Sequence, residues 1–309
     1  MNLAALDLNL LVALDALLTQ RSVTRAATQM GLSQPALSAS LARLRRHFDD
    51  ELLTRVGNDY RLTPLAVQLR DRTQVALSSV ERVFTAQQDF DAASSTREFS
   101  MLVSDYMVTL IGDTVARLLA QEAPHSRLRF IPNTPERVDR AAQTLLSTDL
   151  LVLPHGFVTD LSHLDLYRDE WVCVVSADNS AVGPQLSLTD LETMPWVLSY
   201  HGPTASTPAG RQMRMLGVEP HVQVVTENFL TVPGLVAGSE RIALLQRRLV
   251  ELLPLNSGIR ALPPPFDAAP LIEAMWWHPT YDDDPGHRYL RDLIVRATAI
   301  SLVDIAGQN

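Results

Sequence analysis

The sequence has no lysine, a single cysteine and no long apolar run. Cys173 therefore cannot form an intramolecular disulfide, and its place in the apolar segment 171–175 favours a packed, inert thiol. No run approaches the roughly 18–20 apolar residues that a membrane span needs. The first residues lack the basic start of a secretory signal, and Asp7 interrupts them. These absences exclude a disulfide scaffold and predict a cytoplasmic protein with no membrane partner.

The charge is unevenly distributed along the 309 residues, a length that predicts two or three domains. The net charge is -9, but residues 1–61 hold seven arginines and six acidic residues (+1), whereas residues 62–309 hold nineteen and twenty-nine (-10). No acidic residue lies between Asp15 and Asp49, a stretch that contains five arginines. A small basic patch on an acidic body is typical of a protein that touches phosphates at one end. A solvated basic helical face would give the same pattern.

The first fifty residues predict a helix-turn-helix. Residues 8–19 and 23–30 have helical spacing, and Gly31 follows where the chain needs a tight turn. Ser33 is expected to cap a third helix that is apolar on one side and has small polar and basic residues on the other. Such a helix fits a DNA major groove, although a generic three-helix packing motif would share the pattern.

Residues 50–55 and 60–62 read as two short strands around a turn, which would form a wing beside the helices. Gln34 and Ser38 suit base edges, and the arginines suit guanine or phosphate. The residues expected to contact double-stranded DNA are Thr24, Arg25, Ser33, Gln34, Pro35, Ser38, Arg43, Arg45, Arg46, Arg55, Asn58 and Arg61.

Two segments of this head, Ser-Val-Thr-Arg-Ala-Ala at 22–27 and Leu-Ser-Gln-Pro-Ala-Leu-Ser at 32–38, resemble the LysR-type transcriptional regulators, as do Leu41, Leu44, Leu52 and Arg55. The segment 48–53 resembles the NodD/NahR branch, whereas more typical members carry glycine near position 49. The resemblance implies a regulator of the LysR type that binds a palindromic promoter operator and acts on RNA polymerase. It also implies a homodimer or homotetramer.

Residues 63–93 predict a linker helix. Positions 66, 69, 73, 76, 80 and 83 form a seam with alternating steps of three and four residues. A lone helix must bury such a seam against its own chain or a second copy. The resemblance to the LysR-type regulators implies that the seam packs against a second copy of the chain.

From Arg97 onward, strands alternate with helices, among them helices expected over 135–146 and 230–237. This pattern is the signature of parallel βαβ units and predicts an α/β domain over 94–309 behind the head of residues 1–62. The chain is expected to leave subdomain I (94–168 and 268–309) near Asp169 and to cross subdomain II (169–267). The resemblance implies a two-subdomain effector domain similar to periplasmic solute-binding proteins.

Ligands of open α/β folds sit beyond the carboxyl ends of strands, where free helix N–H groups attract polar groups. The same residues could instead be helix caps or core. The resemblance implies a small-molecule effector, an aromatic compound such as a salicylate or flavonoid, or a carboxylate. The candidate effector contacts are Ser104, Asp105, Tyr106, Pro154, His155, His201, Thr204, Asn228 and Phe229.

An enzyme or a stand-alone solute-binding protein is the competing class. The sequence has no P-loop, no dinucleotide fingerprint, no H-E-x-x-H and no G-x-S-x-G. The eight histidines show no metal-ligand spacing, and Asp282-Asp283-Asp284 suits a solvated turn. We therefore expect no catalytic residue, metal or cofactor.

Overall fold

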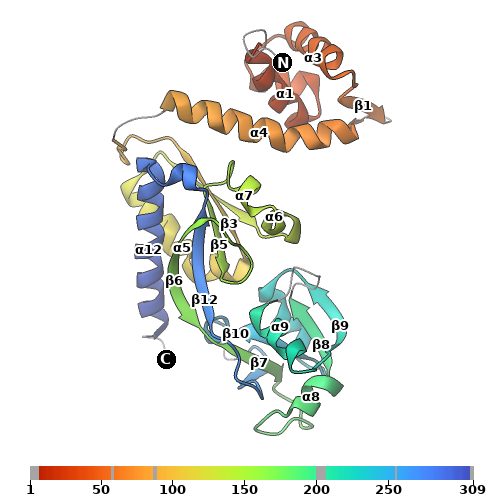
Figure 1. The fold of residues 1–309 in the computed structure, drawn as a ribbon, viewed down its shortest axis with the longest axis vertical. Coiled ribbons are helices and arrows are strands. Elements are labelled where there is room, and N and C mark those ends of the chain that lie inside the picture. Colours follow the sequence, from red (N-terminus) through yellow and green to blue (C-terminus); the bar gives the residue numbers. More distant parts are fainter. Residues whose placement is uncertain (1–6, 57–58, 86–88, 200–206, 255, 307–309) are drawn as a thin grey trace. The chain divides into compact units, whose positions relative to one another are not determined.

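The computed structural model describes residues 7–56, 59–85, 89–199, 207–254 and 256–306 (Figure 1). Its contacts divide the chain into two units, residues 1–86 and 87–309. Each unit has its own buried apolar clusters. Among the described helices, none has the length and apolar character that a membrane span requires.

The first unit begins with the three expected helices, α1 (Asn9–Gln20), α2 (Val23–Gln29) and α3 (Gln34–Phe48). Two serines start the second and third helix: Ser22 Oγ accepts from Arg25 N–H, and Ser33 Oγ accepts from Ala36 N–H, each at 3.4 Å. Gly31 lies between these helices with φ +65°, a left-handed conformation that favours glycine. The local signals in the sequence are therefore the ones that shape the helix-turn-helix.

Strands β1 (Leu53–Val56) and β2 (Asp59–Leu62) form the predicted antiparallel wing, with Leu53 opposite Leu62. The long helix α4 (Pro64–Thr85) follows and packs against α1. The core of this unit is built mainly from leucines: Leu14, Leu17, Leu18, Leu37, Leu41, Leu44, Leu52 and Leu53, together with alanines such as Ala66.

The first sheet of the second unit has the strand order β4-β3-β5-β12-β6. Strand β3 is parallel to β4 and β5, whereas β12 is antiparallel to β5 and β6. The strands are β3 (Glu98–Val103), β4 (Arg127–Pro132), β5 (Leu150–Pro154), β6 (Ser162–Asp169) and β12 (Leu271–Trp277).

Helices cover both faces of this sheet. Alternating strand residues pack against α5 (Asp105–Glu122) and α12 (Pro285–Ala306) on one face. The other face packs against α7 (Ala141–Thr144), which follows α6 (Pro135–Asp139).

The second sheet has the order β11-β7-β10-β8-β9. Its strands are β7 (Trp171–Ser176), β8 (Pro195–Ser199), β9 (His221–Thr226), β10 (Ile242–Gln246) and β11 (Ile259–Leu262). Cys173 is fully buried in β7, and burial raises the pKa of its thiol to about 12, so the thiol is inert as expected. Helices α8 (Leu188–Thr193) and α9 (Pro208–Met215) contribute to the same core cluster as Cys173.

The chain passes from the first sheet to the second at Glu170, between β6 and β7, and returns between β11 and β12. The short elements η2 (Phe229–Thr231), α10 (Val232–Val236), α11 (Arg247–Glu251) and η3 (Pro279–Tyr281) complete the unit.

Three details differ from the sequence expectations. The helix expected over 135–146 is two short helices separated by Arg140, and the helix expected over 230–237 begins as the 3-10 turn η2. The first sheet is mixed rather than parallel throughout, because β12 returns antiparallel between β5 and β6.

Candidate functional site

The third helix of the first unit presents a polar surface. Leu37, Leu41 and Leu44 face the core, and the residues between them on the other side are exposed. Pro35 is tolerated near the start of the helix because no intrahelical N–H bond is lost there. The helix therefore projects the N-terminal residues Gln34 and Ser38 into solvent.

Almost all predicted DNA contacts lie on the surface of this unit. Arg45 is the half-buried exception, and Asn58 lies outside the described residues. The exposed ones are Thr24, Arg25, Ser33, Gln34, Pro35, Ser38, Arg43, Arg46, Arg55 and Arg61.

Arg45 joins α3 to the wing. Its Nε donates to the carbonyl of Glu51 at 2.9 Å, its Nη2 donates to the carbonyl of Leu53 at 3.2 Å, and it pairs with the Glu51 carboxylate at 2.9 Å. These bonds occupy the guanidinium that the sequence suggested for guanine or phosphate. The neighbouring Arg46 is exposed, and its Nε donates to the carbonyl of Ala42 at 3.4 Å. Arg46 is thus better placed for a phosphate than Arg45.

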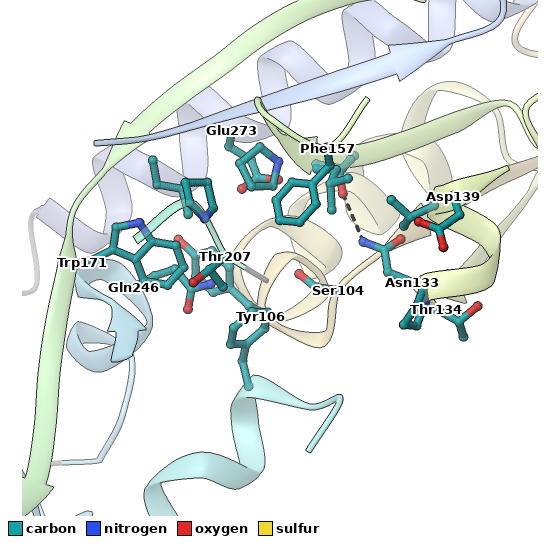
Figure 2. A pocket seen from close by; sticks show the side chains of 18 residues that line it. Ser104, Tyr106, Asn133, Thr134, Asp139, Phe157, Trp171, Thr207, Gln246 and Glu273 are labelled. Atoms are coloured by element: carbon teal, nitrogen blue, oxygen red, sulfur yellow. Dashed lines mark hydrogen bonds between the residues drawn. The ribbon is translucent and has the colours of Figure 1, made fainter. Parts of the chain in front are cut away.

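The second unit contains a cleft that holds about 690 Å³ of space, part of it open to solvent (Figure 2). Residues from both sheets line it: Ser104, Tyr106, Asn133 and Glu273 come from the first sheet and its helices, and Trp171, Thr207 and Gln246 come from the second. Its walls are formed largely by aromatic and aliphatic side chains with a few polar groups between them, the lining that small-molecule sites usually have.

Four predicted effector contacts line this cleft: Ser104, Tyr106, Pro154 and Phe229. Asp105, His155 and Asn228 are not among the lining residues. His201 and Thr204 lie outside the described residues.

Asp105 instead ties α5 to η2. Its carboxylate accepts from the backbone N–H groups of Phe229 at 3.0 Å and Leu230 at 2.9 Å. These bonds hold the aromatic ring of Phe229 at the cleft wall, so Asp105 positions a lining residue.

Three buried polar atoms in the cleft lining have no hydrogen-bond partner among the described residues: Trp171 Nε1, Gln246 Oε1 and Asn133 Oδ1. Their residues are only 3%, 3% and 6% exposed. A buried polar group without a partner is unfavourable by about 1–3 kcal/mol. Within the described part of the chain, the cleft lining therefore has one donor and two acceptors that are not satisfied by protein groups.

The described residues of the lining set the charge of the cleft. Among its described lining residues there is no arginine, lysine or histidine. Burial raises the pKa of Glu273 to about 8, and the nearby Asp169 carboxylate adds to the rise, so Glu273 is protonated and uncharged at neutral pH. A protonated carboxyl can donate a hydrogen bond.

A buried network lies next to the cleft. Tyr106 donates from its hydroxyl to Asp169 at 2.7 Å, and Tyr167 donates to the Tyr106 oxygen at 3.0 Å. Burial raises the pKa of Tyr106 well above its usual range, so it remains a donor. The network fixes the Tyr106 ring at the cleft and joins α5 to the end of β6, where the chain crosses to the second sheet.

Several lining residues were not among the candidates predicted from the sequence. Asn133 and Thr134 follow the carboxyl end of β4, so the rule used for other strands would have found them. Thr207 caps α9, which was not predicted. Trp171, Gln246 and Glu273 lie within strands and gave no signal distinct from core residues.

A winged helix-turn-helix unit and a two-sheet α/β unit with a small-molecule cleft define a class, the ligand-controlled DNA-binding regulators. Residues 8–67 match the family model "Bacterial regulatory helix-turn-helix protein, lysR family", and residues 92–299 match "LysR substrate binding domain". The chain belongs to the LysR family and is a transcriptional regulator, not an enzyme.

Relatives match along nearly the whole chain. Nodulation protein D 2 of Rhizobium tropici is 30% identical over 302 residues, covering 97% of this chain and 95% of the relative. The "probable transcriptional regulator PA0477 from Pseudomonas aeruginosa" shares the fold with a TM-score of 0.71 and 24% identity, covering 94% and 97% of the two chains.

The LysR family regulator CbnR, in a crystal structure with its target DNA, matches with a TM-score of 0.65 and 15% identity, covering 96% of this chain and 100% of that one. These similarities confirm the fold class.

Proposed function

We propose that this regulator acts in the cytoplasm as a homodimer or homotetramer, binds a palindromic promoter operator and controls RNA polymerase in response to a small molecule. Gln34 and Ser38, exposed at the start of α3, would read base edges, and Arg46 would bind phosphate. Two heads related by a two-fold axis would fit a palindrome.

The proposed dimer contact is the second half of the α4 seam. In the first half, Ala66 and Thr73 are buried and Leu69 packs on the core of the same unit. Val83, at the far end of the seam, is 72% exposed. A partner helix would cover the part of the seam that the chain itself leaves open.

The proposed effector is a small, neutral, hydroxylated aromatic compound. The cleft offers aromatic side chains for stacking, together with one indole donor and two amide acceptors that are unpaired within the described part of the chain. A phenolic hydroxyl can both donate and accept, so it suits this set. A carboxylate fits less well because no cationic side chain is present among the described lining residues.

The three unpartnered buried atoms carry this proposal, and a pair of ligands tests it. Thermal unfolding of the full chain is measured with a hydroxylated flavone and with salicylate. The flavone should raise the unfolding midpoint, because a ligand that binds only the folded state stabilises it, and salicylate should leave it nearly unchanged.

A matched variant pair locates the site. Gln246→Met keeps the shape of the side chain but removes the acceptor, and should weaken flavone binding about 2- to 10-fold, the value of one neutral hydrogen bond. Thr298→Val removes another buried, unpartnered polar atom on α12, outside the cleft lining, and should not change binding. A larger shift with salicylate, or equal binding by both variants, would contradict the proposal.

A further inference from the structure

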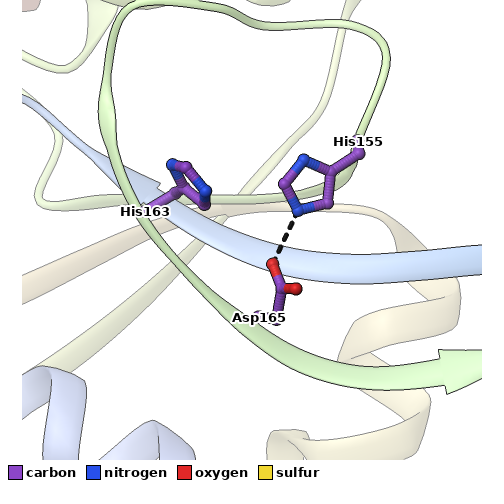
Figure 3. Close-up of side chains that lie close together, drawn as sticks. All are labelled: His155, His163 and Asp165. Atoms are coloured by element: carbon purple, nitrogen blue, oxygen red, sulfur yellow. Dashed lines mark hydrogen bonds and ion pairs between the residues drawn. The ribbon is translucent and has the colours of Figure 1, made fainter.

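Outside the residues that line the cleft, three potential metal ligands meet on the surface of the first sheet (Figure 3). His155 follows β5, and His163 and Asp165 lie two residues apart on β6. One imidazole nitrogen of each histidine and one carboxylate oxygen of Asp165 all lie within 4.8 Å of one another. Residue spacing does not reveal this cluster, because β12 lies between β5 and β6 and its pairing with both strands brings His155 to the other two residues.

The ring of Trp276 on β12 packs against the imidazoles of both histidines. It pairs with His163 across the strands, and its ring centroid lies 4.6 Å from that of His163 and 5.0 Å from that of His155. The backbone N–H of His155 also donates to the carbonyl of Ile272 at 3.1 Å. Both histidines are thus oriented by β12 before any ion arrives.

The hydrogen bonds leave suitable lone pairs. The Nδ1–H of His163 donates to the carbonyl of Leu161 at 3.3 Å, which places the lone pair on Nε2. A bond of this kind to the outer nitrogen fixes the tautomer in metal sites. The Nε2–H of His155 donates to Asp165 Oδ1 at 2.6 Å, so one proton occupies the position between two ligand atoms.

We propose that His155, His163 and Asp165 bind a divalent transition metal ion of the Zn²⁺ and Ni²⁺ class. Two imidazoles and a carboxylate suit these ions, whereas Mg²⁺ and Ca²⁺ prefer all-oxygen sites. The ion replaces the proton between His155 and Asp165, which passes to solvent, and water completes the coordination. The side chains of His155 and Asp165 are 37% and 59% exposed, so the ion has access.

The bound ion would hold the loop that joins β5 to β6. Phe157 of this loop lines the cleft, and the carbonyl of Gly156 accepts from Arg211 Nη2 of α9 at 3.0 Å. Fixing His155 to β6 therefore fixes the start of a segment that contacts the second subdomain. The proposed metal binding does not depend on the proposed effector. Only an effect of the bound ion on effector binding would depend on it.

Isothermal titration of the untagged full chain with ZnCl₂ and NiCl₂ tests the site. Binding should weaken about tenfold or more in His163→Ala and in Asp165→Asn. His125→Ala, which removes an exposed histidine outside the cluster, should bind as the parent does, and MgCl₂ should give no heat of binding. Circular dichroism confirms that each variant is folded. Unchanged affinity in His163→Ala, or an equal loss in His125→Ala, overturns the proposal.

Hydrogen–deuterium exchange of the same proteins tests the loop. ZnCl₂ should slow exchange of the backbone amides at 156–161 in the parent chain and not in His163→Ala. Metal binding without slower exchange at 156–161 would overturn the link between the ion and the loop. The proposed effector site is tested separately by the flavone experiment.

Discussion

At the residue scale, two adjacent aspartates at the end of α3 have different roles. Asp49 adopts the left-handed conformation, with φ +50°, which is favourable for glycine and costly for most other residues. Asp50 Oδ1 accepts from Leu52 N–H at 2.6 Å and from Thr63 Oγ1 at 2.7 Å. Asp49 therefore has a strained backbone conformation, whereas the side chain of Asp50 connects the end of α3 to the start of α4.

Glycine at the two positions should have opposite effects. Asp49→Gly should stabilise the first unit by about 0.5–1 kcal/mol, because it relieves the left-handed strain and removes a negative charge from a helix C-terminus. Asp50→Gly should destabilise it by roughly 1–3 kcal/mol through lost hydrogen bonds. Hydrogen exchange of the α3 amides in the full chain gives both free energies of opening. A change of the same sign in both variants would refute this account.

Glu273 should make stability depend on pH. Its pKa rises from 4.5 in the unfolded chain to about 8 in the folded one, so between these values only the folded state holds the proton. Stability should therefore fall as pH rises through this window, by on the order of 4 kcal/mol. Glu273→Gln should remove this pH-dependent loss of stability. The difference in free energy of unfolding between the variant and the parent should therefore grow in favour of the variant from pH 5 to pH 8.

Urea unfolding at pH 5, 6, 7 and 8 measures that difference. Glu98→Gln changes an exposed glutamate on β3 and serves as the control. Its difference from the parent in free energy of unfolding should not grow comparably with pH. An advantage of Glu273→Gln that stays constant with pH would mean that Glu273 is already ionised in the folded protein.

At the element scale, α4 has two exposed valines on opposite faces. Val83 belongs to the seam and is 72% exposed, whereas Val67 is 46% exposed and lies sixteen residues earlier, about 160° around the helix. Val83→Asp should shift the oligomer toward monomer, because a charge would enter the proposed helix pair. Val67→Asp should leave the oligomeric state unchanged. Sedimentation velocity at several protein concentrations distinguishes them; an equal shift in both variants would argue against this face.

Elements with local signals were predictable from the sequence. Ser22, Gly31 and Ser33 mark the helix-turn-helix directly, and the wing follows from two short strand-like segments on either side of a turn. Strand β6 was missed because its burial depends on β12, which returns from a point about a hundred residues later. The expected fold class is right because each α/β unit repeats a local pattern.

The candidate sites were predictable only in part. Ser104 and Tyr106 follow a strand end, which the sequence shows. Trp171 and Gln246 line the cleft because of where the second sheet faces the first, and no local pattern encodes that. The same reason applies to His155 and His163, which meet across β12.

At the scale of the whole molecule, DNA binding must work against the net charge. The chain carries -9, with +1 on residues 1–61 and -10 on residues 62–309. Few positive groups are therefore expected to touch phosphate, and the remainder of the chain repels it. The affinity for duplex DNA should fall with salt in proportion to the number of phosphates neutralised.

A single arginine should change this salt dependence measurably. For a fluorescent duplex of random sequence, Arg46→Ala should reduce the slope of log K against log salt by about 0.9, the value of one phosphate contact. Arg140→Ala removes an exposed arginine of the second unit, paired with Glu136 at 3.6 Å, and should leave the slope unchanged. Fluorescence anisotropy at several salt concentrations gives all three slopes. Equal slopes for Arg46→Ala and the parent would exclude Arg46 from the phosphate contacts, and an equal reduction by Arg140→Ala would place DNA binding beyond the winged head.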